Sequence, residues 1–365
     1  MSHTNPPDLD SRKRLLAQIV TIDDLTEQRI FTLRALTYSN IHLPWLDVDP
    51  QSFVEWSSKV RPELETIVEY DASSNCVMIK GRPYMLNNAI TMSFNHLFYK
   101  ITLQQGPQNF DFHPTMPMKR FRFVGQYENT QLVPDTYLKA KDDPFPRHVI
   151  LVGPFNSIKN IVTAARHWIL STAGVTKTVT IFVLQLDRPP LPMPVLINSP
   201  AFQKNYGLLD DEVRSVYGNV EALATYIINW YFENTPLKLG GEYFCRIITF
   251  DHEYVYGKRP VATLKFSARE SEIPDVSLRD QSGQPIFELE GETLNLNELI
   301  VVLQNRVESE ANRIAIYLAR CKLGQLGVLQ DQGLCSNAMT HYPVLPEYHE
   351  RYFDEEFART CNGRR

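Results

Sequence analysis

The stretch LVPDTYLKAKDDPFPRHVILVGPFNS, residues 132–157, carries the pattern from which the fold is predicted. A Pro-Asp pair opens it, and the apolar run HVILVG follows a polar, Pro-containing segment. Because Pro and Asp favour turns while β-branched and apolar runs favour strands, the stretch predicts two short strands joined by a polar turn. Asp135 stands at the start of the first strand, and Leu151 lies in the second.

A helix and a third strand follow directly. Residues 156–174 have apolar residues at helical spacing and end at Gly174, a residue suited to ending a helix. Asn156 or Ser157 can cap the first turn. The run VTIFVLQLD, residues 179–187, is apolar on both faces, as in a buried strand. This order of strand, helix and strand predicts a crossover between parallel strands. The sequence thus predicts an α/β fold with a mixed central sheet flanked by helices and with helical additions at the N- and C-terminal ends.

The chain divides into four predicted parts. They are an N-terminal helical extension at 1–60, an α/β core at 61–190, a continuation of the core at 191–323 and an irregular tail at 324–365. The continuation is expected to contain a helix, further strands and a long C-terminal helix. The Pro-rich segment RPPLPMPVLINSP at 188–200 is the best candidate for a boundary or a lid-like loop.

The long C-terminal helix is predicted from its cap and its apolar stripe. Asn295 and Glu298 resemble a capping box at its start. The stripe consists of Leu299, Leu303, Val307, Ala311, Ile314 and Leu318. A stripe at this spacing usually packs on the core of its own domain, and a dimerisation helix is the alternative.

The composition is that of a soluble globular protein. Of 365 residues, 43% are hydrophobic and 22% are charged, with a net charge of -5. This balance argues against a broad surface for nucleic acid but not against a local basic cleft. The five cysteines contain no C-x-x-C pair, the N-terminus is polar, and the apolar runs are too short to span a bilayer. We expect an intracellular protein, cytoplasmic or nuclear, with no membrane partner.

The order of elements and several residues resemble the PD-(D/E)XK, or restriction-endonuclease-like, superfamily. Pro134-Asp135 matches the Pro-Asp at the end of a family strand, and DDPFP at 142–146 matches the following link. Arg166 falls where the family's helix carries Lys, and Gly174-Val175 matches the end of that helix. The resemblance covers roughly residues 60–190. It is greatest to Uma-type endonuclease-like proteins of bacteria and to a group of uncharacterised fungal relatives.

The resemblance implies a metal site from which one ligand is missing. Family members hold Mg²⁺ with the Asp and with a Glu on the next strand, where this sequence has Leu151. Mg²⁺ requires oxygen ligands, and Leu supplies none. The resemblance makes Asp135 and Arg166 the candidate catalytic residues, although Arg166 stays protonated and cannot act as a base. Asp135 and Asp143 are the candidate metal ligands.

Each of these residues also has an ordinary structural interpretation. Asp135 is a carboxylate at a strand end, and Asp142 with Asp143 forms an acidic pair of the kind found in solvated turns. His148 could act as a ligand or base beside Asp135, or be structural at the start of its strand. Glu69 could supply a family-type acidic group, or be solvated.

Three functions remain open on the sequence. The first is a catalytically degenerate nuclease-like domain that binds nucleic acid or a protein partner, without a cofactor. The second is an active, divergent Mg²⁺-dependent nuclease, a phosphodiesterase that combines Asp135 with Asp142, Asp143 or Glu69. The third is an accessory or interaction protein unrelated to nucleic acid. MKRFRF at 118–123 mixes basic and aromatic residues as a nucleic-acid-binding strand does, but the same pattern is common on edge strands.

Overall fold

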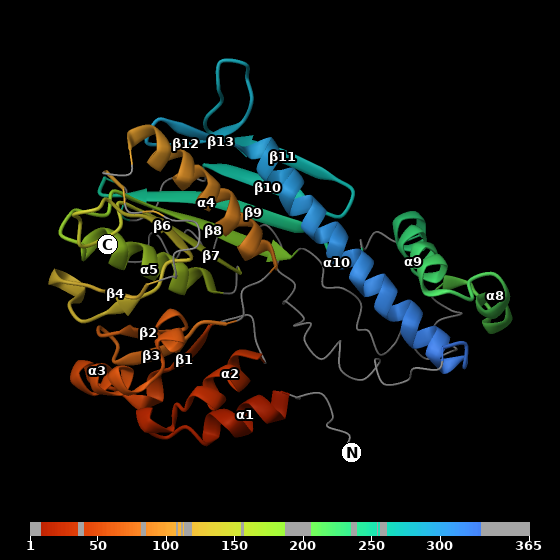
Figure 1. Cartoon of the computed structure of the whole chain (residues 1–365), viewed down its shortest axis with the longest axis horizontal. Helices are drawn as coiled ribbons and strands as arrows, with labels where there is room; N and C mark the ends of the chain where they lie inside the picture. The colour runs from red at the N-terminus through yellow and green to blue at the C-terminus, as the bar shows by residue number, and fades with distance from the viewer. Residues whose placement is uncertain are drawn as a thin grey trace.

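The chain is a mixed α/β protein with two large sheets (Figure 1). The computed structural model describes residues 9–35, 40–81, 85–106, 109–110, 112, 119–154, 157–186, 206–234, 239–253, 255 and 261–329. Within these ranges the sheets have five and six strands, and a separate hairpin has two. No helix in these ranges is long and apolar enough to cross a membrane.

The six-stranded sheet has the order β11-β10-β9-β8-β7-β6. Its strands are β6 (Thr136–Leu138), β7 (His148–Pro154), β8 (Thr178–Leu186), β9 (Tyr243–Asp251), β10 (Ala262–Phe266) and β11 (Ser271–Val276). Strands β7 and β8 are parallel and joined by helix α5 (Ile158–Leu170), whereas the other neighbours in this sheet are antiparallel. The predicted hairpin and the predicted crossover are both confirmed.

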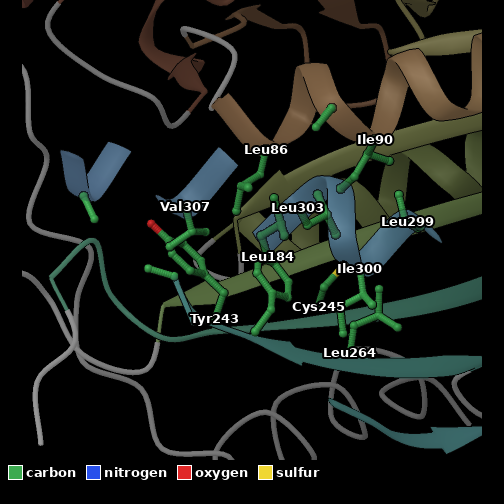
Figure 2. Close-up of a cluster of buried hydrophobic side chains, with 14 of the residues drawn as sticks. Leu86, Ile90, Leu184, Tyr243, Cys245, Leu264, Leu299, Ile300, Leu303 and Val307 are labelled. Atoms are coloured by element: carbon green, nitrogen blue, oxygen red, sulfur yellow. The ribbon is translucent and has the colours of Figure 1, made fainter. Parts of the chain in front are cut away.

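Helices cover both faces of this sheet. On one face, α4 (Met85–Gln105) and α10 (Leu296–Gln325) pack over strand residues such as Ile150 and Phe182. Figure 2 shows side chains of both helices meeting those of β8, β9 and β10. On the other face, α5 packs over alternate residues of the same strands, including Leu151. Strands β7 and β8 are therefore buried on both faces, as the sequence predicted for the second of them.

The five-stranded sheet belongs to a unit that lies below the larger sheet in Figure 1. Its order is β1-β3-β2-β5-β4, with strands β1 (Ile41–Leu43), β2 (Val68–Asp71), β3 (Cys76–Ile79), β4 (Phe121–Arg122) and β5 (Gln131–Leu132). Three helices belong to the same unit: α1 (Leu9–Ala17), α2 (Glu27–Ala35) and α3 (Pro50–Lys59). Helices α1 to α3 and strands β1 to β3 have a core of their own, with Phe53 stacked on Tyr70 at a ring distance of 4.6 Å. Phe121 of β4 and Leu132 of β5 instead pack into the core beside α5.

The N-terminal part of the chain is not purely helical, contrary to the prediction. Strand β1 pairs antiparallel with β3, so the N-terminal part contributes a strand to the sheet as well as three helices. A strand of three residues is too short to produce a recognisable alternation in the sequence.

The C-terminal elements follow the prediction where the structure describes them. Helix α9 (Val220–Asn234) follows the short α8 (Asp210–Ser215), and the hairpin β12 (Ile286–Leu289) and β13 (Glu292–Asn295) precedes α10. Asn295 caps α10 by accepting a hydrogen bond from the backbone N–H of Asn297 at 2.8 Å, and the predicted apolar stripe is buried. The Pro-rich segment at 188–200 and the tail beyond 329 lie outside the described residues.

A short segment leads from the five-stranded sheet to the six-stranded sheet. Residues 133–135 lead from β5 in the five-stranded sheet directly to β6 in the six-stranded sheet. Asp135, the residue highlighted by the sequence, is the last residue of this segment. Its backbone N–H donates to the carbonyl of Ile150 at 3.1 Å, which fixes it against β7.

Candidate functional site

A cavity of about 860 Å³ lies where the two sheets meet. Its lining comes from β2 and β3, the connecting segment 133–135, the first turns of α4 and α5, and the carboxyl end of β7. In open α/β sheets, ligands bind at the carboxyl ends of parallel strands, beside the helix that follows. The cavity has this position relative to β7 and α5.

Asp135 is bonded on both of its carboxylate oxygens. Oδ1 lies 3.0 Å from Nζ of Lys80, and Oδ2 accepts the backbone N–H of Val152 at 2.7 Å. The side chains of Lys80 and Asp135 are 19% and 20% exposed. The carboxylate is therefore held in place by a cation from one sheet and by a backbone amide from the other.

Lys80 follows β3 and reaches across to the connecting segment. Its Nζ donates to the carbonyl of Val133 at 3.0 Å, in addition to its bond with Asp135. Burial lowers the pKa of Lys80, but the nearby carboxylates of Asp135 and Glu69 outweigh that effect, and the net pKa is raised. Lys80 is thus a permanent ammonium group near neutral pH and not a candidate for a neutral amine base.

Glu69 is the second carboxyl group in the cavity. It lies on β2, is 5% exposed, and accepts the backbone N–H of Val133 through Oε1 at 2.8 Å. Burial raises its pKa; the charge of Lys80 and the hydrogen bond from Val133 oppose this rise, and the charge of Asp135 adds to it. Glu69 therefore holds a proton at higher pH than an ordinary Glu does.

Glu69 and Lys80 together satisfy both backbone polar groups of Val133. Glu69 accepts the N–H of Val133, and Lys80 donates to its C=O. The segment between the sheets therefore has no unpaired backbone group at this residue. The cluster thus has a structural role in joining the two sheets, whatever else the cavity does.

The structure brings together three of the residues that the sequence singled out. Asp135, Leu151 and Glu69 all line the cavity. Leu151 is 6% exposed, so an apolar side chain occupies part of the wall near Asp135. Lys80 was missed in the sequence. The sequence contained a weak indication of its role. A Lys that directly follows the apolar strand CVMI is expected to be buried only when it pairs with a carboxylate.

Asp142 and Asp143 are not near Asp135. Asp143 accepts from Nε of Arg147 at 2.8 Å, in the turn between β6 and β7. Asp135 lies at the opposite end of β6, and the intervening strand of three residues spans roughly 10 Å. The structure therefore does not bring the predicted metal pair of Asp135 and Asp143 together, because the two residues lie at opposite ends of one hairpin.

His148 is also distant from Asp135, at the other end of β7. Its Nδ1 lies 2.8 Å from Oγ1 of Thr178, and its Nε2 lies 2.7 Å from Oε1 of Glu290. The ring therefore ties the hairpin β12–β13 to the start of β8. The hypothesis that His148 acts as a base beside Asp135 is wrong.

Arg166 does not line the cavity either. The residues of α5 that do so include Asn160, Ile161 and Ala164. Arg166 follows Ala164 by two positions, which is a rotation of about 200° around the helix. The helix therefore directs Arg166 away from Asp135, and the two predicted catalytic residues do not meet.

The cavity does not fit Mg²⁺. Both oxygens of Asp135 are already bonded, burial raises the pKa of Glu69 and so disfavours its charged form, and Leu151 offers no ligand atom. The ammonium group of Lys80 would also repel a cation placed beside Asp135. In the part of the chain that the structure describes, no three His, Cys, Asp or Glu residues converge as a metal site.

Comparison with known proteins gives no relative. No family model matches the chain, and neither a curated protein nor a solved structure matches it. The resemblance to the PD-(D/E)XK superfamily thus stays a prediction from the sequence.

Proposed function

We propose that the chain is a nuclease-like α/β domain that acts by binding a ligand in the cavity and has no metal-dependent phosphodiesterase activity. One observation carries this proposal: Nζ of Lys80 lies 3.0 Å from Asp135, where a nuclease would hold its metal ion. The connection of β6, β7, α5 and β8 supports a restriction-endonuclease-like core, since it has the strand and helix order of that superfamily.

The loss of hydrolysis follows from the chemistry of these side chains. In metal-dependent nucleases the ion polarises the phosphate and lowers the pKa of its bound water. A lysine ammonium group can attract a phosphate oxygen but cannot bind and activate water in this way. Lys80 is moreover already engaged by Asp135 and by the carbonyl of Val133.

The size of the cavity favours a small ligand over a protein partner. A cavity of about 860 Å³ lies within the usual size of small-ligand sites, roughly 300–1,000 Å³. Stable protein interfaces instead bury about 800 Å² on each partner over a broad surface. A single nucleotide or nucleoside is a small ligand of this kind.

A divergent active nuclease is the second candidate, because Glu69 and Asp135 line the same cavity. In this case Lys80 would have to leave Asp135 when a metal ion binds. The two carboxyl groups would then supply the ligands that the sequence pattern alone did not provide.

Cleavage assays separate the two candidates. The full chain would be incubated with labelled single- and double-stranded DNA and RNA, with Mg²⁺ or Mn²⁺, and binding measured in parallel. The proposal predicts no cleavage by the wild type. Cleavage that Asp135→Asn abolishes and that Asp143→Asn preserves would overturn the proposal in favour of the second candidate. Asp143 is a matched control, since its carboxylate lies in the turn beyond β6.

A further inference from the structure

Glu69 is a buried acid that forms no ion pair. Only 5% of this residue is exposed. Among the described residues no cation lies within ion-pairing distance of its carboxyl group, and the ammonium group of Lys80 bonds to Asp135 and to the carbonyl of Val133 instead. A buried carboxylate without a paired cation is costly, so burial favours the protonated form of Glu69.

The charged groups around Glu69 act in both directions. Lys80 and Arg120 favour its ionised form, and Asp135 opposes it. Arg120 also faces Glu65, which shares its charge. The cavity lining adds further charged groups of both signs, Arg34, Lys119, Glu63 and Glu65. Burial is the largest effect on Glu69, and its pKa is raised in spite of the two cations.

The carboxyl group of Glu69 anchors the segment between the sheets. Val133 directly follows β5, and its backbone N–H donates to Oε1 of Glu69 at 2.8 Å rather than to a neighbouring strand. The next residue, Pro134, has no N–H to donate. The N–H of Asp135 already bonds to Ile150 in the other sheet. Glu69 is therefore the acceptor that holds this segment against the five-stranded sheet.

The anchored segment is also a wall of the cavity. Val133, Pro134 and Asp135 all line it, and so does Glu69. A change in the bond between Glu69 and Val133 therefore alters the wall at the point where the two sheets meet. An ionised Glu69 requires hydration, and the cavity beside it can supply water when the segment moves away from β2.

We infer that Glu69 and Val133 form a proton-dependent latch between the two sheets. While Glu69 carries its proton, the latch is closed and the segment 133–135 lies against β2. Ionisation of Glu69 opens the latch, and water from the cavity then hydrates the carboxylate. The inference concerns access to the cavity, so it goes beyond the proposed function and does not depend on which ligand the cavity binds.

The direction and size of the effect follow from proton linkage. In the open state the hydrated carboxyl group has a pKa near the ordinary Glu value of 4.5, and in the closed state its pKa is higher. The closed state therefore binds the proton more tightly than the open state. The ratio of open to closed molecules rises with pH above 4.5, by up to about tenfold per pH unit, until the pKa of the closed state is reached.

Amide hydrogen exchange of the full chain, resolved by residue and corrected for the intrinsic effect of pH, tests the inference. In the wild type the protection of the Val133 amide should fall at least about fivefold between about pH 5 and about pH 7. Low concentrations of denaturant should leave this protection unchanged, because a local opening exposes little surface. Glu69→Gln keeps an acceptor for the N–H of Val133 but has no acid, so its protection should not vary with pH. Glu308→Gln, exposed on α10, should behave as the wild type does.

Three results would each overturn the inference. They are protection of Val133 that does not change with pH in the wild type, an equal fall in Glu69→Gln, and exchange that responds to denaturant as global unfolding does. Thermal denaturation establishes that the variants fold, and the wild-type measurements decide the matter without them. Nuclease activity would contradict the proposed function and would leave these exchange results unaffected.

Discussion

Nζ of Lys80 lies 3.0 Å from Oδ1 of Asp135, and this ion pair joins the end of β3 in one sheet to the start of β6 in the other. The same ammonium group donates to Val133 in the segment that connects the sheets. The pair therefore contributes to the stability of the interface between the sheets, and in the nuclease-like core that we propose it occupies the position of the metal ion.

Lys80→Met should lower the free energy of unfolding by about 2–3 kcal/mol, because Asp135 is left as a largely buried charge without a cation. Chemical denaturation measures this change. The matched control is Arg214→Met, which breaks the exposed pair with Asp211 and should cost less than about 1 kcal/mol. A double-mutant cycle with Asp135→Asn should show strong coupling, and additive effects would contradict the account.

Glu69→Gln should change how stability depends on pH. Because burial raises the pKa of Glu69 in the folded state, the folded chain binds this proton more tightly than the unfolded chain. The contribution of Glu69 to the stability of the wild type therefore falls as pH rises above the ordinary Glu value of 4.5, and Glu69→Gln should gain stability relative to the wild type over the same range. Denaturation at several pH values measures the difference. The exposed Glu308→Gln is the control, and a parallel response of the two variants would refute the prediction.

Gly153→Ala should destabilise the contact between β7 and α5. A Cβ at Gly153 would lie 2.5 Å from Cδ1 of Ile161, the far end of a flexible side chain that lines the cavity, so this carbon must shift, at a cost of about 1 kcal/mol. Ile161→Val removes that terminal carbon and should recover about half of the loss when combined with Gly153→Ala. Thermal melting of the single and double variants tests this. If the loss of stability in the double variant equals the sum of the losses in the two single variants, the contact with Ile161 is not what destabilises Gly153→Ala.

Replacing Leu151 and Lys80 together should create a metal site. In Lys80→Met with Leu151→Glu, a new carboxylate faces the cavity and the competing ammonium group is gone. We expect Mn²⁺ to bind with a one-to-one stoichiometry in calorimetry, whereas Lys80→Met with Leu151→Gln should not bind it. Equal behaviour of the two folded variants would count against the resemblance to metal-dependent nucleases.

Long apolar elements could be predicted from the sequence, and short ones could not. The order of β7, α5 and β8 was predictable because each is a sustained apolar pattern bounded by Pro or Gly. The basic and aromatic run at 118–123 has the pattern of a strand, but β4 spans only Phe121–Arg122 and a short 3₁₀ helix follows it. A strand of two residues forms because of its tertiary contacts, and such contacts leave no periodic pattern in a sequence.

The site was predicted only in part, for geometrical reasons. Asp135 and Leu151 share the cavity because they belong to neighbouring strands, as the pattern indicated. Asp143 is close in sequence but lies at the far end of the hairpin, and Arg166 lies on the wrong side of its helix. Lys80 comes from the other sheet, and its pairing with Asp135 requires a contact across 55 positions of sequence. Contacts at this separation cannot be derived from local spacing.

Calorimetric titration of the wild type with Mg²⁺ and Mn²⁺, beside Asp135→Ala and Asp143→Ala, tests the central claim most directly. The account predicts no saturable binding at millimolar concentrations in any of the three proteins, because Lys80 and Leu151 leave no place for the ion. One-to-one binding by the wild type and by Asp143→Ala, lost in Asp135→Ala, would contradict it and would restore a working metal site to the cavity.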